Sequence, residues 1–255
     1  MILLVILIGY LSWGPLFPWN PVKPGFTEIE SEKAVIYVQD YAEKDSVLHQ
    51  IQTIIQEEEE FHDLEYRDDF RIIVLSDDNS MKRYLPWMKG SGFSVSLSLV
   101  DVIYIGPAAR NSLKGIEPHL KHELSHLLID QNTTFKKALK IHDQGWLAEG
   151  LAEYFSDHQF YTETEFLKLC RMYEFSFTKL HEQNPLSMSI SQVRLNYTFY
   201  KFFIEFLVEN YGIEKFQKYL KEYLNDPDNY KELFISVYSQ SLDEILDKFR
   251  SHFNM

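Results

Sequence analysis

The apolar residues of this 255-residue chain change their spacing near Ile116. Before that point, short β-branched and apolar runs stand on either side of one long helical pattern. After it, apolar residues recur at helical intervals up to the C-terminus. This change predicts an α+β fold: a small mixed sheet with helices in the N-terminal half, a helix at the change, and an all-helical C-terminal half.

The first half reads as strand, helix, strand over residues 33–39, 42–61 and 70–75, an order that usually gives neighbouring parallel strands. A short helix at 77–84, capped by Asp77 or Asp78, and a strand at 101–105 are expected to follow. Residues 92–99 alternate small polar and apolar side chains. In the second half we expect helices near 118–130, 145–158, 163–173, 196–211, 214–224 and 242–253.

Residues 1–19 carry no charged side chain and are nearly all apolar through Leu11. We interpret them as an apolar leader or membrane anchor, which predicts a membrane-anchored or secreted protein with its folded body outside the cytoplasm. The segment lacks the Lys or Arg of a signal peptide, and Pro15 and Pro18 make it short for a membrane span. An N-terminal element packed into the core is the alternative.

Residues 20–32, with Pro21, Pro24 and Gly25, read as a spacer, and residues 33–255 as one folded domain, since no linker-like stretch divides them. The formal charge of -13 repels phosphate backbones, so we expect no nucleic-acid partner. The acidic run 57–60 falls late in a helical pattern and is interpreted as a solvated helix face. The single cysteine, Cys170, is expected to fill core. Nothing indicates the oligomeric state.

The motif that points to chemistry is His122-Glu123-Leu124-Ser125-His126, an HExxH inside a predicted helix. Residues four apart share a helix face, so both imidazoles can reach one ion about 2 Å from each nitrogen. Glu123 lies a quarter turn away, where it can contact a metal-bound water. The other face of this helix is apolar, with Leu120, Leu124, Leu127 and Leu128.

A second predicted amphipathic helix, WLAEGLAEYF, begins at Trp146. Leu147, Leu151 and Phe155 form its apolar side, and Glu149 and Glu153 share the other. Carboxylates four apart repel each other unless a cation or an imidazole satisfies them. One can complete a His/His/Glu metal site, and the other can accept the free ring N–H of a ligand histidine.

These two motifs, followed by NYTFYKFFIEFLVENYG, resemble the gluzincin zinc metallopeptidases, the thermolysin and alanyl-aminopeptidase clan, and most closely their compact peptidase MA-like domains. The resemblance covers residues 92–224. It implies one Zn²⁺ per chain held by His122, His126 and Glu149, Glu123 as general base, Glu153 as a supporting acid, and a minimal thermolysin-like fold.

In the aminopeptidase branch, a tyrosine at the start of a later helix steadies the oxyanion, and Tyr197 matches it, with Tyr200 one turn away as the alternative. The Gly-x-Met-Glu-Asn strand that grips a free amine is missing, so the resemblance implies an endopeptidase. The strand at 101–105 is our candidate edge for pairing with an extended peptide.

The expected function is therefore hydrolysis of peptide bonds by a zinc-activated water that Glu123 deprotonates, with Tyr197 as oxyanion donor. Two alternatives stay open: an inactive or metal-binding relative that binds peptides or a partner protein, and a zinc hydrolase of non-peptide substrates. The other seven histidines are interpreted as surface or core groups, with His142 the most open to a role because it lies just before the second motif.

Overall fold

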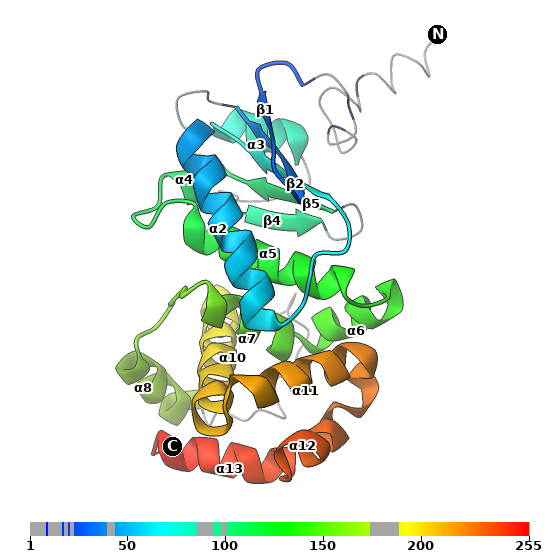
Figure 1. Ribbon diagram of the computed structural model, residues 1–255. Helices are drawn as coiled ribbons and strands as arrows, with labels where there is room; N and C mark the ends of the chain where they lie inside the picture. The colour runs from blue at the N-terminus through cyan, green and yellow to red at the C-terminus, as the bar shows by residue number, and fades with distance from the viewer. Residues whose placement is uncertain are drawn as a thin grey trace. The chain divides into compact units, whose positions relative to one another are not determined.

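The computed structural model describes residues 23–39, 44–85, 94–97, 101–173 and 189–254, together with Gly9, Phe17 and Asn20. In these residues the strands all precede Ile116 and only helices follow it, so the predicted α+β fold is confirmed (Figure 1). The chain divides into two compact units, one made of residues 1–59 and 65–127 and the other of 60–64 and 128–255. The sequence predicts one body over 33–255, because no linker-like stretch divides these residues. Helix α5 (Glu117–Gln131) contributes residues to both units.

The first unit contains a five-stranded mixed sheet in the order β1-β2-β3-β5-β4 (Figure 1). The outer strands β1 and β4 are antiparallel to their neighbours, and β2, β3 and β5 run parallel. The predicted parallel pair at either end of the long helix is confirmed as β2 and β3 joined by α2. Bounds in this unit are β1 Thr27–Glu30, β2 Ala34–Val38, α2 Lys44–His62, β3 Phe70–Val74, α3 Asp78–Tyr84, β4 Ser94–Leu97, β5 Val102–Ile105 and α4 Pro107–Arg110.

Two features of the sheet differ from the sequence expectations. Strand β1 lies within residues 20–32, the range expected to be a spacer, where Ile29 is buried opposite Ile36 of β2. The strand at 101–105 is wrong as a candidate edge, because β5 pairs with β3 on one side and with β4 on the other. Among the strands that the structure describes, β4 is the outermost at that end of the sheet.

One face of the sheet packs with α3 into an apolar cluster that includes Tyr37, Ile73, Tyr104 and Tyr84. Phe17, from the expected leader, belongs to this cluster: it is fully buried, and its ring centroid lies 4.2 Å from that of Tyr84. Apart from Gly9 and Phe17, the leader or anchor at 1–19 lies outside the described residues. No helix among the described residues is long and apolar enough to cross a membrane.

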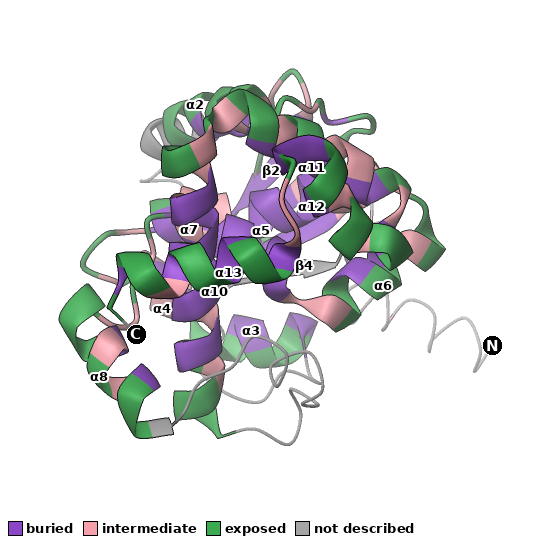
Figure 2. Ribbon diagram, turned by 90° about the horizontal axis from the view of Figure 1, so that it is seen from below, coloured by how far each residue is buried: buried purple, intermediate pink, exposed green. Residues whose placement is uncertain are grey.

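The second unit is helical. The expected helices are all present, but α10 begins at Ile190 rather than near Asn196, and α6 and α12 lie outside the ranges expected to be helical. Most residues of α6 and α8 are exposed, and these helices are largely green in Figure 2. The bounds are α6 Phe135–Gln144, α7 Trp146–Phe155, α8 Glu163–Tyr173, α10 Ile190–Tyr211, α11 Ile213–Asn225, α12 Tyr230–Tyr238 and α13 Leu242–His252.

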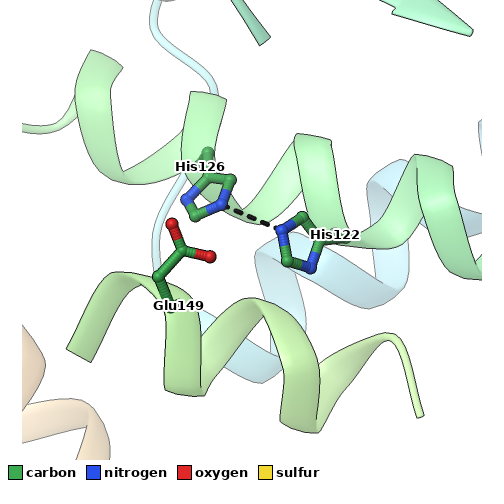
Figure 3. A group of neighbouring side chains, drawn as sticks. All are labelled: His122, His126 and Glu149. Atoms are coloured by element: carbon green, nitrogen blue, oxygen red, sulfur yellow. Dashed lines mark hydrogen bonds between the residues drawn. The ribbon is translucent and has the colours of Figure 1, made fainter. Parts of the chain in front are cut away.

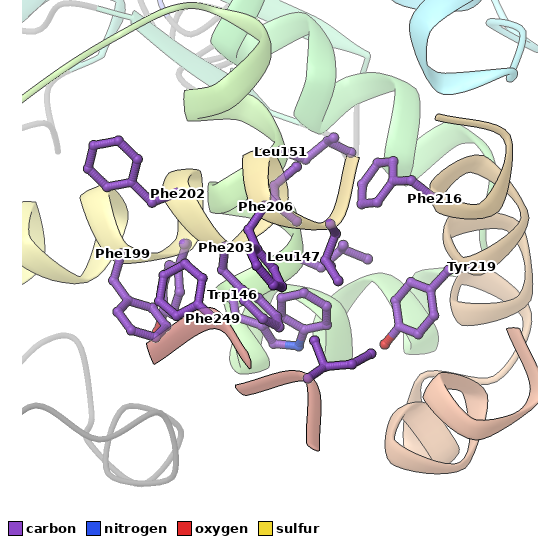
Figure 4. Packing of buried hydrophobic residues seen from close by; sticks show 14 of the residues in the cluster. Trp146, Leu147, Leu151, Phe199, Phe202, Phe203, Phe206, Phe216, Tyr219 and Phe249 are labelled. Atoms are coloured by element: carbon purple, nitrogen blue, oxygen red, sulfur yellow. The ribbon is translucent and has the colours of Figure 1, made fainter. Parts of the chain in front are cut away.

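The core of this unit forms around Trp146, the first residue of α7, which is fully buried among aromatic and aliphatic side chains (Figure 4). Its ring lies 5.9 Å from that of Phe203 on α10 and 6.1 Å from that of Tyr219 on α11. Helices α7 and α10 approach closely: a Cβ on Gly150 would lie 2.9 Å from the carbonyl oxygen of Tyr200. Cys170 is buried in the same core, as expected, and burial raises the pKa of its thiol to about 12.

Candidate metal centre

The two histidines of the HExxH motif point toward each other from successive turns of α5. Their Nε2 atoms are 3.2 Å apart, and their rings are nearly perpendicular, at 81°. Two nitrogens bound to one zinc ion at about 2.0–2.1 Å in a tetrahedral arrangement would be separated by about 3.3 Å. The spacing of His122 and His126 therefore matches that of two ligands of a single cation.

The opposite face of α5 is core, as the sequence predicts: Leu120, Leu124, Leu127 and Leu128 are fully buried. Glu123, the proposed base, is 8% exposed, as is His126, whereas His122 is half-buried. A carboxylate with this little exposure has few waters available to it, which favours a specific role for the group over a solvated one.

The third expected ligand, Glu149, lies in the first turn of α7. Leu147 and Leu151 anchor the apolar side of this helix in the core, so the predicted division of its two faces is confirmed for these residues. A carboxylate in the first turn is also favoured by the helix dipole. Glu149 lies close enough to Tyr197 on α10 to help raise the pKa of the Tyr197 phenol.

His122, His126 and Glu149 form a group that can hold a metal ion (Figure 3). Each offers one ligand atom, and these atoms all lie within 4.8 Å of one another. Two imidazole nitrogens and one carboxylate oxygen form the donor set of many catalytic zinc sites, in which a fourth position is left for water or substrate. The residues present thus fit a metal ion such as zinc by donor type, and the two histidines also fit it by spacing.

Glu153, the expected supporting acid, is 2% exposed and accepts a hydrogen bond from Nδ1 of His158 at 2.9 Å. Burial raises the pKa of this carboxyl, and the His158 contact acts against that rise. Lys201 donates to the carbonyl oxygen of His158 at 3.1 Å and to Asp157 at 3.2 Å. From the sequence alone His158 is expected to be a surface or core histidine. Its position five residues after Glu153, just beyond the end of α7, was the signal that could have found it.

Tyr197 and Tyr200 differ in their surroundings. Tyr200 is 5% exposed and belongs to the apolar core of the second unit, whereas Tyr197 is half-buried and lies near Glu149. Burial, followed by the nearby Glu149 charge, raises the pKa of Tyr197 far above its ordinary value. Its phenol therefore keeps its proton at ordinary pH and can donate a hydrogen bond.

The acidic run 57–60 supports α5 and is not simply a solvated face. Glu58 is fully buried and accepts from Ser125 Oγ, while Glu57 forms an ion pair with Lys121 at 3.0 Å. The expectation of a solvated face is wrong for Glu58, because this residue lies on the side of α2 that faces Ser125. Outside the acidic run, Tyr66 makes a further contact with α5: its hydroxyl donates to the carbonyl oxygen of Leu124 at 3.1 Å.

Of the remaining histidines, His142 pairs with Asp130 in the second unit, at 2.8 Å. His62 is fully buried beside Phe155, and His181 lies outside the described residues. No protein-family model and no curated protein matches the chain. The site is therefore interpreted from its own residues and their geometry.

Proposed function

We propose that the protein is a zinc metallopeptidase of the gluzincin type with a thermolysin-like catalytic fold, acting as an endopeptidase. The observation that carries the proposal is the group His122, His126 and Glu149, whose ligand atoms lie within 4.8 Å of one another. The Nε2 separation of 3.2 Å between the histidines supports a single shared ion. Zinc is the first choice of metal because this mixed nitrogen and oxygen donor set suits it.

Zinc at this site would supply a positive charge that polarises a carbonyl oxygen and acidifies a water. Glu123 is the base in this proposal: it accepts a proton from the attacking water and passes it to the leaving amine. Its place next to His122, and its 8% exposure, support this role. The protonated phenol of Tyr197 is the donor to the oxyanion, which Tyr200, packed in the core, is less suited to reach.

The test begins with the purified full chain, loaded with zinc and incubated with a mixed peptide library. We expect one zinc per chain, internal cleavage of peptides, and loss of cleavage after chelation. The Glu123→Gln variant should keep its zinc and lose about 10²- to 10⁴-fold in turnover, the range for general acid–base catalysis. His49→Ala, at an exposed position on α2, is the matched control and should leave zinc content and turnover unchanged.

The outcomes separate the proposal from its alternatives. Zinc binding without cleavage of any peptide would favour a peptide-binding relative or a hydrolase of other substrates. Unchanged turnover in Glu123→Gln would refute the role of the base. A chain that binds no zinc would remove the basis of the proposal.

A further inference from the structure

Arg194 lies on α10 three residues before Tyr197, so both side chains belong to one face of the helix. Its guanidinium carbon is 5.5 Å from the ring centroid of Phe160, in the segment between α7 and α8, and the side chain is exposed. A guanidinium above an aromatic ring is held in place while the N–H groups at its edge stay available.

Phe160 connects Arg194 to the candidate site. Its ring lies edge-on to His158, with centroids 4.3 Å apart, and 6.4 Å from the ring of Tyr197. His158 in turn donates to Glu153, and Tyr197 lies near Glu149. The ring of Phe160 is therefore near the Arg194 cation, His158 and Tyr197.

Arg194 is a positive charge in a part of the chain that carries several acidic residues. The chain has a formal charge of -13, and Glu149, Glu153 and Asp157 lie in this part of the second unit. The neighbouring cation on α10, Lys201, is 7% exposed and engaged with Asp157 and with the His158 carbonyl oxygen. Among the described residues, Arg194 has no carboxylate partner, so its donors are available to a bound molecule.

We propose that Arg194 recognises a carboxylate on the substrate, about one helical turn from Tyr197, and so makes this site selective for acidic peptides. The inference rests on the proposed function. A carboxylate can accept two parallel hydrogen bonds from the two N–H groups of the guanidinium. A neutral amide lacks the negative charge that strengthens these bonds. The carboxylate can come from a Glu or Asp side chain or from the C-terminus of the peptide. Arg194 is in either case a specificity-determining residue.

The experiment uses the full zinc-loaded chain and four peptides that differ only in one Glu or Gln and in a free or amidated C-terminus. Both kcat/KM and, in the Glu123→Gln background, the Kd of each labelled peptide are measured, so that binding is read without turnover. We expect a preference of roughly ten- to a hundredfold for the peptide with the recognised carboxylate, the range for hydrogen bonds to charged groups. The Glu/Gln pair and the acid/amide pair show which source is read.

The Arg194→Gln variant should lose this preference through KM while cleaving the neutral peptide within about twofold of the wild type. Arg194→Lys should keep part of it, because the charge remains but the fork is lost. Arg250→Gln, at a half-buried arginine on α13, is the control and should keep the full preference. Equal Kd values for acidic and neutral peptides, or a preference that survives Arg194→Gln, would overturn the inference. Binding selectivity without any cleavage would instead contradict the proposed function and leave the role of Arg194 supported.

Discussion

Ser125 donates a hydrogen bond from its Oγ to the carboxylate of Glu58, at 3.2 and 3.1 Å from the two oxygens, although 67 positions separate them in the chain. Both residues are fully buried. The residue beside the second histidine of the motif is thus fixed by an acidic group from another helix. Burial raises the pKa of the Glu58 carboxyl well above its ordinary value, and the Ser125 contact acts against that rise.

The raised pKa of Glu58 predicts how stability depends on pH. Above the unfolded-state pKa the unfolded chain loses this proton while the folded chain keeps it, so the stability that Glu58 contributes falls as pH rises toward the folded pKa. Relative to Glu58→Gln, the free energy of unfolding of the wild type should decrease by about 1.4 kcal/mol per pH unit across that interval. Urea unfolding at several pH values from 4 to 8 measures it. A difference that stays flat would contradict the prediction, and Glu60→Gln, at an exposed position, is the control.

Removing zinc should lower the thermal stability of the wild type. A ligand present at a thousandfold excess over its Kd stabilises the folded state by about 4 kcal/mol, so chelation should produce a clear fall in Tm. In His126→Ala the Tm should no longer respond to zinc, because one of three ligands is lost. Thermal melts with zinc and with chelator test this, with His49→Ala again as control. Equal zinc dependence in His126→Ala and wild type would count against the ligand assignment.

Tyr197 and Tyr200 of α10 should respond differently to loss of the hydroxyl. Tyr197→Phe should lower kcat by about 10²- to 10³-fold with zinc content unchanged, as removal of an oxyanion donor does. Tyr200→Phe should change kcat only a few fold, since its ring serves the core. Steady-state kinetics on one peptide decide between them, and the reverse order of effects would assign the donor to Tyr200.

Gly150 should be essential for the packing of α7 on α10. In Gly150→Ala the new Cβ would meet the Tyr200 backbone at 2.9 Å, and neither helix backbone can shift cheaply. We expect a loss of about 1–3 kcal/mol in the free energy of unfolding, typical of overpacking. Lys140→Ala on α6, at an exposed position, should change it by less than about 0.5 kcal/mol. Chemical denaturation measures the free energy of unfolding of both variants. If Gly150→Ala left it unchanged, the two helices could separate without cost.

The sequence predicts best those features that depend on spacing within one helix. His122 and His126 are four apart, and the buried leucines of α5 follow from the same periodicity. The start of α10 is also predictable, because Ser189 and Gln192, three residues apart, form a capping box, which is a sequence signal of a helix start.

Features that depend on distant partners could not be predicted in this way. Nothing local in residues 101–105 indicates that β4 would pair with β5 and remove its edge. The acidic run looks the same whether Glu58 faces water or Ser125. The apolar pattern of α6 does not indicate its buried side. Phe135 and Leu139 are 57% and 56% exposed, and only Ala138 and Ile141 are buried.

Gly145 ends α6 and begins α7 with a φ of +69°, a backbone conformation that glycine adopts readily and other residues rarely do. The backbone N–H of Glu149 bonds to the carbonyl oxygen of Gly145 at 2.9 Å, so the junction determines the angular position of every side chain on α7. Adding or deleting one residue after Gly145 would rotate the helix by about 100° relative to its core contacts. Natural or engineered length variation at this junction should therefore be incompatible with the site, whereas the surface segments elsewhere can change length with less effect.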